Sequence, residues 1–293
     1  MSDTAVFSVL PDLALLEISG PDSERFLQGQ LTCDVAALQA GRWTLGACCT
    51  AKGRMVANFV IGRQDNTFWL RLPREQVAAL HQHLSRYAVF FKTTLADRSD
   101  DWQVLGAVPA QSSPALLTQP QPLPVIADGL ELQWPDGRRE RWQAGNTAGH
   151  SPDNGQWAAA DIRQGLIWVT EASREQWVPQ HIDWHHQGGI SFRKGCYTGQ
   201  EIVARLQYLG KSKKQVIQLY SEQPLDLAVL TPLQDQQGKA IGEVACWAGQ
   251  QGLAVINAGS LPAALLAGDI SLTGAGLFYT DGINDGTDTE PAQ

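Results

Sequence analysis

The chain has 293 residues, of which 43% are hydrophobic and 18% are charged. A chain of this length is expected to form two or three domains, and its composition excludes a wholly disordered protein. The formal net charge of −8 argues against a general nucleic-acid binder.

The N-terminal segment and the cysteines indicate the compartment. Residues 1–18 contain Asp3 and Asp12 and lack the basic start and apolar run of a secretory signal. No stretch approaches the roughly 20 apolar residues that span a bilayer. The five cysteines include no Cys-x-x-Cys pair, which favours reduced thiols over a disulfide framework or structural zinc. We therefore expect a soluble, cytoplasmic protein with no membrane partner.

The first half of the chain has the patterns of a mixed α and β structure. Strands are predicted over residues 13–18, 43–50, 54–62 and 67–72. In the third strand, alternation predicts that one face carries Met55, Ala57, Phe59 and Ile61. One helix is expected after Gly20-Pro21-Asp22 and another over residues 74–87, where apolar residues recur at helical spacing.

The second half contains two polar connections, a hairpin and a run of short strands. Residues 108–124 and 145–156 have the composition of surface connections. Pro135-Asp136-Gly137 separates two strand patterns and predicts a hairpin. Later strands are predicted over residues 215–220, 228–232, 240–247 and 253–257. These short strands indicate a small β-barrel or sandwich, followed by an acidic tail that we expect to be disordered.

The segment KGCYTGQE is the leading candidate for chemistry. It consists of Lys194, Gly195, Cys196, Tyr197, Thr198, Gly199, Gln200 and Glu201. Thr198 is followed three residues later by Glu201, which fits a capping box and predicts a helix that starts at Thr198. Gly195 and Gly199 lack side chains, so we expect the backbone at both positions to allow close approach of other groups.

Cys196 is the candidate reactive residue of this segment. It would lie just outside the N-terminus of the predicted helix and close to Lys194. Both features favour a thiolate, so we expect its pKa to lie below the free value. The alternative is a buried, inert cysteine in a tight loop.

A basic stretch and a group of tryptophans flank this segment. Six positive residues and one negative residue, Glu201, give the stretch a charge of +5 (6 − 1). The positive residues are Arg193, Lys194, Arg205, Lys211, Lys213 and Lys214. Five of the ten tryptophans fall within residues 142–184. Aromatic faces beside positive charge suit a flat heterocycle with an anionic tail, whereas the simpler interpretation is core packing beside a solvated surface.

Two histidines have a spacing that also occurs in metal sites. His181 and His185 are four residues apart, but no third ligand is evident nearby in the sequence. We therefore assign no metal.

The twelve residues KGCYTGQEIVAR resemble the signature of the YgfZ-type folate-binding proteins, which are relatives of the glycine-cleavage T protein. Three further blocks match the family in the same order: GPDSERFLQGQLTCDV (residues 20–35), AKGRM (51–55) and RYAVFFKTTL (86–95). The signature itself belongs to a longer matching block, GGISFRKGCYTGQE (188–201), which begins six residues before Lys194. The resemblance covers most of residues 10–210.

This resemblance implies an α+β fold of the T-protein type. Residues 1–210 would form a folate-binding α/β core of two interleaved subdomains around a central channel. Residues 211–280 would form a C-terminal β-barrel, and residues 281–293 a disordered tail. The family also implies tetrahydrofolate binding, in a mono- or polyglutamate form, and support of the assembly or repair of iron–sulfur client proteins. An effect on tRNA thiomodification would be indirect, through an iron–sulfur enzyme.

Individual positions carry over from the family to this chain. Cys196 matches the motif cysteine, and Trp157 matches a tryptophan implicated in folate binding. Leu13 stands where some members have a second folate-site tryptophan. Arg163 stands where the T protein has a glutamate that accepts hydrogen bonds from the pterin, which a guanidinium cannot do. Lys194 and Arg205 are the candidates to hold the anionic tail.

Two alternative functions remain. A folate-dependent aminomethyl transferase would need a carboxylate beside the reactive nitrogen of the folate, and the sequence does not identify one. A direct tRNA-binding module is favoured by the basic stretch and opposed by the overall acidity. Strong salt dependence of RNA binding would mark it.

Overall fold

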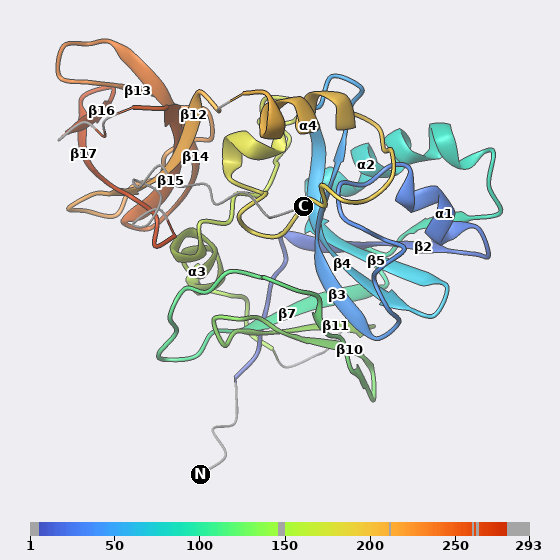
Figure 1. Cartoon of the computed structure of the whole chain (residues 1–293). Coiled ribbons are helices and arrows are strands. Elements are labelled where there is room, and N and C mark those ends of the chain that lie inside the picture. The colour runs from blue at the N-terminus through green and yellow to red at the C-terminus, as the bar shows by residue number, and fades with distance from the viewer. Residues whose placement is uncertain (1–5, 146–149, 211, 260, 262–263, 280–293) are drawn as a thin grey trace.

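The computed structural model describes residues 6–145, 150–210, 212–259, 261 and 264–279. Figure 1 shows two β-sheets on one side of the molecule and a barrel on the other. No helix within the described residues is long and apolar enough to cross a membrane. The expected disordered tail, residues 281–293, lies outside the described residues.

The first sheet has six strands in the order β6-β2-β5-β4-β3-β8. These are β2 (Leu13–Ser19), β3 (Arg42–Cys49), β4 (Met55–Gln64), β5 (Thr67–Pro73), β6 (Thr94–Asp97) and β8 (Gln121–Pro122). Two helices, α1 (Ser23–Gln28) and α2 (Arg74–Ala88), cover one face of this sheet. Val77, Leu80 and Leu84 of α2 are buried against the sheet. The observed elements confirm the strands and the two helices predicted for this part of the chain.

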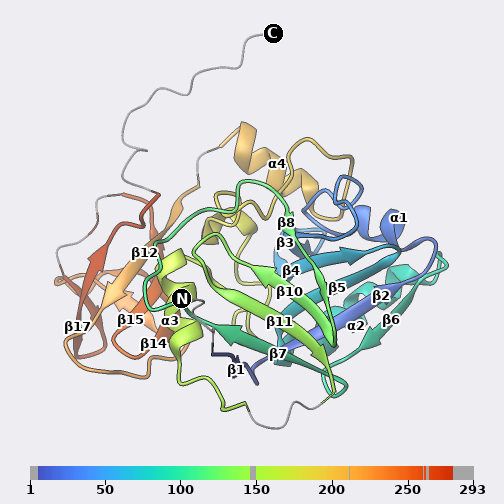
Figure 2. The same ribbon diagram turned by 90° about the horizontal axis from the view of Figure 1, so that it is seen from below.

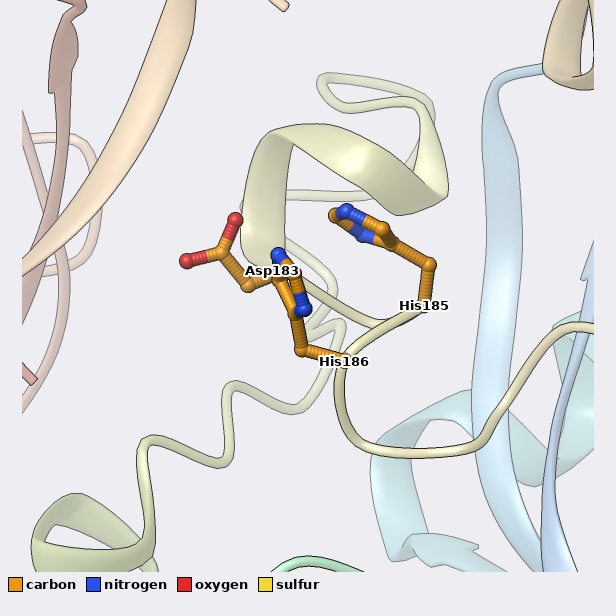
Figure 3. A group of neighbouring side chains, drawn as sticks. All are labelled: Asp183, His185 and His186. Atoms are coloured by element: carbon orange, nitrogen blue, oxygen red, sulfur yellow. The ribbon is translucent and has the colours of Figure 1, made fainter. Parts of the chain in front are cut away.

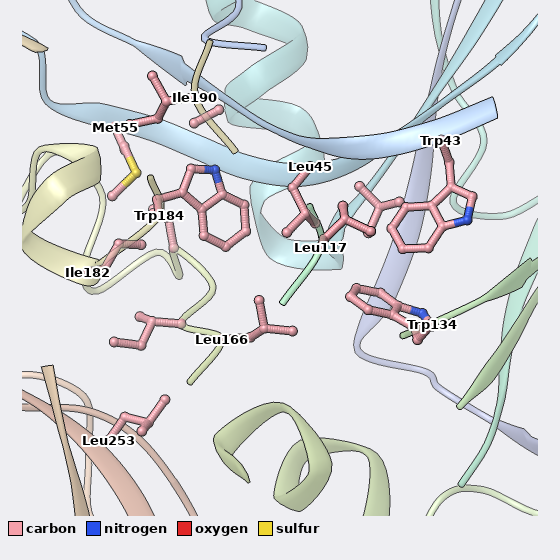
Figure 4. Packing of buried hydrophobic residues seen from close by; sticks show 14 of the residues in the cluster. Trp43, Leu45, Met55, Leu117, Trp134, Leu166, Ile182, Trp184, Ile190 and Leu253 are labelled. Carbon is pink, nitrogen blue, oxygen red and sulfur yellow. The ribbon is translucent and has the colours of Figure 1, made fainter. Parts of the chain in front are cut away.

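A bulge in β4 changes the face that one predicted residue occupies. Cys48 pairs with Ala57, whereas Cys49 pairs with Met55, so two residues of β4 oppose Cys49. Met55 therefore packs into the central core near Trp184 (Figure 4), while Ala57, Phe59 and Ile61 face the helices. The prediction that all four residues share one face is wrong for Met55, because the extra residue reverses the alternation.

The second sheet has five strands in the order β1-β7-β11-β10-β9. These are β1 (Ser8–Val9), β7 (Trp102–Ala107), β9 (Val125–Ile126), β10 (Gly129–Gln133) and β11 (Arg139–Ala144). Leu130 pairs with Trp142, which confirms the predicted hairpin. The two sheets form successive layers, as Figure 2 shows for β10 and β11 over β4 and β5. Trp43 of the first sheet packs on Trp134, beside the second, with ring centroids 5.0 Å apart (Figure 4).

Helix α3 (Gln156–Gln164) lies between the second sheet and the barrel (Figure 1). It begins after Gly155 (φ 88°) and ends at Gly165 (φ 72°), both in the left-handed region that favours glycine. The chain then passes through a short 3₁₀ helix, η1 (Pro179–Ile182), and α4 (Gln200–Tyr208). Helix α3 is absent from the sequence prediction; it directly follows the polar connection expected over residues 145–156.

The C-terminal strands close into a six-stranded barrel in the order β12-β15-β14-β13-β16-β17. They are β12 (Lys214–Tyr220), β13 (Pro232–Gln234), β14 (Ala240–Ala248), β15 (Gln251–Asn257), β16 (Leu265–Ala267) and β17 (Ile270–Ala275). The barrel is thus confirmed over the sandwich. The predicted strand 228–232 is wrong, because Thr231 closes a turn onto the Ala228 carbonyl and Leu230 has φ 68°. The domain division at residue 210 stays a prediction.

Candidate functional site

A cavity of about 560 Å³ opens where the first sheet, α3 and the barrel meet. Its wall is assembled from segments far apart in the sequence: the start of β2, the start of α2, one face of α3, the chain just after α3, and the end of β14. The lining residues are Asp12, Leu13, Pro73, Arg74, Glu75, Ala158, Asp161, Ile162, Leu166, Trp168, Thr170, Cys246 and Trp247. A cleft at such a junction is a typical place for a small ligand.

Most of the wall is apolar, and its aromatic rings are held in place. The Trp168 Nε1 donates a hydrogen bond of 2.8 Å to Asp161, and its ring packs edge-on against Trp184. The guanidinium of Arg71 lies 4.5 Å from the centroid of the Trp168 ring. On the barrel side, Trp247 donates from Nε1 to the Gly249 carbonyl at 2.8 Å. Fixed rings of this kind offer flat faces to a planar ligand.

Asp161 supplies a buried carboxylate to the cavity wall. Its Oδ1 accepts a 2.6 Å hydrogen bond from Arg138 Nη1, and its Oδ2 accepts one from Trp168. Arg138 also donates to Asp136 at 2.7 Å. Burial opposes the charge of Arg138, but Asp161 and Asp136 together hold its pKa above the usual range. Asp161 is therefore paired with a charged donor. Each of its carboxylate oxygens keeps a lone pair that can accept a further hydrogen bond.

The mouth of the cavity carries exposed charged residues. Arg74 is the first residue of α2, and its Nε donates to the Pro11 carbonyl at 2.9 Å. Its side chain is 42% exposed and lies 3.8 Å from the fully exposed Asp100, so its charge remains available at the surface. Glu75 accepts a 2.7 Å hydrogen bond from the backbone of Glu171. Arg74 is the one positively charged residue among the described residues that line the cavity.

Of the three core residues that the sequence analysis assigned to ligand binding, only one lines the cavity. Leu13 lines the cavity. Trp157 does not: it is 4% exposed and lies behind the wall, with the Arg138 guanidinium 4.6 Å above its ring. Arg163 is also absent from the lining, because it follows Asp161 by two residues and about 200° of helical rotation.

Among the cavity residues that the sequence prediction did not name are Asp161, Arg74 and the barrel pair Cys246 and Trp247. Trp168 is one of the five tryptophans of residues 142–184 that the sequence analysis considered for a flat ligand. One signal for Asp161 was present, since it lies two positions from the expected pterin-binding position at Arg163. Without knowledge of α3, nothing in the sequence decides which of the two side chains faces the ligand.

Lys194 of the KGCYTGQE segment is an internal anchor. Its Nζ donates to three backbone carbonyls, those of Gln28 and Leu31 at 2.7 Å and of Cys33 at 2.9 Å. The side chain is 7% exposed, and burial lowers its pKa to about 8 against the opposing effects of Cys33 and Asp34. The ammonium therefore holds the loop after α1 in place by these three hydrogen bonds. It is not available to Cys196 or to a ligand tail.

Tyr197 is the second buried side chain of the segment. Its ring lies 5.1 Å from the Lys194 ammonium, a separation at which a cation is attracted to an aromatic ring. Burial raises the pKa of its phenol, and the nearby Cys49 and Cys33 add to this effect, so the phenol stays neutral. Tyr197 thus helps Lys194 to hold the loop in place.

The two glycines of the segment differ from each other. Gly199 has φ 86°, and a Cβ there would lie 2.5 Å from the Thr50 carbonyl, in the turn between β3 and β4. Gly195 is exposed, and a Cβ there would meet no other atom within 4 Å. Close approach of another backbone group is therefore confirmed at Gly199, whereas Gly195 faces open space and its expected role stays a prediction.

The helix that follows the loop begins two residues later than predicted. Helix α4 starts at Gln200 with Gly199 as its N-cap, no side chain caps it, and Glu201 is exposed in its first turn. The capping box at Thr198 is therefore wrong: the Thr198 hydroxyl donates instead to Gln30, at 3.3 Å. A polar partner distant in sequence thus replaces the predicted local cap.

Cys196 is exposed, whereas the other four cysteines are buried or partly buried. None of the eight residues from Lys194 to Glu201, all of which the structure describes, lines the cavity. Cys196 therefore lies apart from this cavity. Its thiol faces solvent at a separate place.

The predicted basic stretch is not one continuous surface. Lys194 is buried, Arg205 is exposed on α4 away from the cavity lining, and Lys211 lies outside the described residues. The remaining charges are spread over the loop before α4 and the start of β12. Arg205 is consequently not placed to hold a ligand tail in the cavity.

The histidine-rich segment also differs from its predicted arrangement. His185 groups with Asp183 and His186 rather than with His181 (Figure 3). Burial, followed by the charges of Arg54 and Lys214, lowers the pKa of His181 to about 4.

Comparison with known proteins places these features in a family. The family model described as the GCVT N-terminal domain matches residues 8–119. The tRNA-modifying protein YgfZ of Klebsiella pneumoniae (strain 342) is 39% identical over 225 residues, which cover 70% of this chain and 68% of that protein. The protein of the same name from Cronobacter sakazakii is 35% identical over 227 residues, covering 71% and 68%.

A solved structure shares the fold over most of the chain. The glycine cleavage system aminomethyltransferase T from Bartonella henselae aligns with a TM-score of 0.60 at 15% identity, over 92% of this chain and 84% of that one. The α+β core with its C-terminal barrel is therefore a T-protein-like fold. With the sequence identity to the two relatives, this shows that the chain belongs to the YgfZ family.

Proposed function

We propose that the cavity binds a reduced folate, tetrahydrofolate in its mono- or polyglutamate form. The observation that carries this proposal is the buried Asp161 carboxylate between apolar walls. A pterin ring is flat and presents adjacent N–H donors along one edge. A carboxylate accepts from such donors, and apolar or aromatic side chains cover the ring faces.

The residues present fit this ligand. A carboxylate offers about four lone-pair positions, and Asp161 uses one on each oxygen for Arg138 and Trp168. Two remain for the edge of the pterin. Leu13 and Trp168 provide faces for the ring, and Arg74 at the mouth suits the anionic glutamate tail. In this proposal Asp161 accepts the hydrogen bonds from the pterin, which the guanidinium of Arg163 cannot accept.

The wider role that we propose is support of the assembly or repair of iron–sulfur client proteins. The relatives are named tRNA-modifying proteins, and we propose that an effect on tRNA thiomodification passes through an iron–sulfur enzyme. The exposed Cys196 thiol supports a contact with a client, because it lies outside the cavity and stays accessible while folate is bound. Strongly salt-dependent RNA binding would instead favour direct action on tRNA.

Replacement of Asp161 tests the folate proposal. Asp161→Asn turns one acceptor oxygen into a donor and should weaken tetrahydrofolate binding by about 1–3 kcal/mol, the scale of a lost charge-assisted hydrogen bond. Titration calorimetry on the untagged protein measures the affinity. Arg163→Gln is the matched control, because it changes a charge on the same helix but on another face.

A second variant separates binding from stability, since Asp161→Asn also removes the negative charge that pairs with Arg138. Trp168→Phe keeps the Asp161–Arg138 pair and the aromatic face but loses the Nε1 donor. We expect it to bind folate more weakly than the control while melting at nearly the same temperature. Unchanged affinity in both cavity variants would remove this cavity as the folate site.

A further inference from the structure

Three side chains with metal-binding atoms meet at the end of η1, outside the folate cavity. They are Asp183, His185 and His186, and their donor atoms all lie within 4.8 Å of one another (Figure 3). None of the three lines the cavity. We propose that they form a site for a transition-metal ion of the Zn²⁺ class, a site distinct from the folate site.

The geometry brings the donors close to bonding separation. Zn²⁺ binds histidine nitrogen and carboxylate oxygen at about 2.0–2.2 Å, which places the ligand atoms of a tetrahedral ion roughly 3.3 Å apart. The imidazole centroids of His185 and His186 are 4.0 Å apart and their planes are tilted by 40°. Small side-chain rotations would therefore suffice to bring the three donors around one ion.

A second observation points to a ligand. The Nδ1 of His185 is buried and has no hydrogen-bond partner among the described residues. A buried polar atom without a partner is unfavourable, and a metal ion would satisfy it.

The carboxylate of Asp183 is held in position by its neighbours. Asp183 has φ 52°, a left-handed backbone at the end of η1. The Tyr279 hydroxyl donates to its Oδ2 at 3.4 Å, and the backbone of Val216 in β12 also bonds to it. Outer partners of this kind orient metal ligands in known sites. An ion here would join the end of η1 to the barrel strand β12 and to the segment that carries Tyr279.

The donor set indicates which ions fit. Two imidazoles and one carboxylate suit Zn²⁺ or Co²⁺, whereas Mg²⁺ and Ca²⁺ prefer a shell of oxygen atoms. Three protein ligands leave at least one position for water, because structural zinc sites are closed by four. The site is therefore of the open type.

Metal titration of the untagged, chelator-treated protein tests this proposal. Cys196→Ser serves as the parent chain, so that the exposed thiol does not bind the probe. We expect one equivalent of Zn²⁺ by calorimetry, and with Co²⁺ the visible absorption of a tetrahedral site. His185→Ala and His186→Gln should each weaken binding by at least about tenfold. His181→Gln is the matched control, because it lies in the same segment but outside the cluster.

The outcomes are distinct. Saturable binding that both cluster variants weaken and the control retains would establish the site. Absence of saturable Zn²⁺ binding, or equal weakening by His181→Gln, would overturn it. His186 is only half-buried, so His186→Gln should fold even if His185→Ala does not. A normal melting curve for the half-buried variant makes its loss of binding interpretable.

Discussion

Asp161 keeps its place in the cavity because Arg138 is buried directly behind it. The guanidinium donates to Asp161 and Asp136, and it lies 4.8 Å from the Trp134 ring and 4.6 Å from the Trp157 ring. In such surroundings a charge without a partner is strongly unfavourable, so each member of this group fixes the others. Trp157 therefore supports the cavity wall by positioning Arg138 behind it.

The cysteines should differ sharply in reactivity. Burial raises the pKa of Cys33 to about 11 and those of Cys48 and Cys246 to about 12, and it also raises the pKa of Cys49. Cys196 is exposed, so its sulfur is accessible to an alkylating reagent. We predict that Cys196 is alkylated faster than the other four near pH 7, as measured by mass spectrometry on the native protein.

The reference for this ranking is the unfolded chain, in which all five thiols should react at similar rates.

Cys196→Ala should leave folding and folate affinity unchanged, because the thiol lies outside the cavity. The same variant should fail to support iron–sulfur enzymes in cells. Rapid alkylation of a buried cysteine in the native protein would contradict the ranking. Full support of those enzymes by Cys196→Ala would rule out a role for the thiol.

At the scale of elements, the sequence was most informative where a repeat of two or 3.6 residues covers a whole segment. The strands β2 to β5, helix α2 and the hairpin of β10 and β11 follow such repeats. Helix α3 has only nine residues between two glycines, and β13 and β16 have three residues each. These short elements are stabilised by tertiary packing, which one sequence does not display.

The same reasoning explains the outcome at the site. Leu13 could be placed because a family resemblance pointed to its position, and the cavity includes it. Asp161 could not be chosen over Arg163 until the helix phase was known. Lys194 looked like a surface charge from its neighbours in sequence, but its three carbonyl partners lie more than 160 residues away. Gly195 and Gly199 are alike in sequence, and only the packing of the turn after β3 distinguishes them.

The KGCYTGQE loop should depend on Lys194 for its stability. Lys194→Met keeps the length of the side chain but leaves three buried carbonyls without their donor. We predict that the free energy of unfolding falls by about 2–4 kcal/mol, because unsatisfied buried acceptors cost roughly 1–3 kcal/mol each and the apolar side chain offsets part of this. Urea unfolding followed by circular dichroism measures the change.

Arg193→Met provides the comparison, since it removes a neighbouring positive charge that is exposed. It should change stability by less than about 0.5 kcal/mol. Under conditions where both variants are folded, tetrahydrofolate affinity should match that of the wild type, because neither residue lines the cavity. Weaker folate binding by folded Lys194→Met would restore this lysine to the ligand site.

At the scale of the whole molecule, the cavity exists only because three parts of the chain meet. The first sheet contributes Leu13, α3 contributes Asp161, and the barrel contributes Trp247. The central core also joins these parts, since buried Leu166 and Leu253 lie in one cluster with Trp184 and Trp43 (Figure 4). A ligand that touches all three parts should bind the assembled chain and stabilise their arrangement.

The contribution of the barrel can be measured through Trp247. Trp247→Ala removes an aromatic face from the cavity wall and should weaken tetrahydrofolate binding by about 1–3 kcal/mol, or roughly 5- to 150-fold. Trp247→Phe keeps a ring and should recover most of that affinity. Tyr220→Ala changes an exposed aromatic residue elsewhere on the barrel and should leave affinity unchanged. Calorimetry gives the affinities, and melting curves establish that each variant is folded. If folded Trp247→Ala binds as tightly as the wild type, the barrel does not contact the ligand, and the pterin must lie against α3 and the first sheet alone.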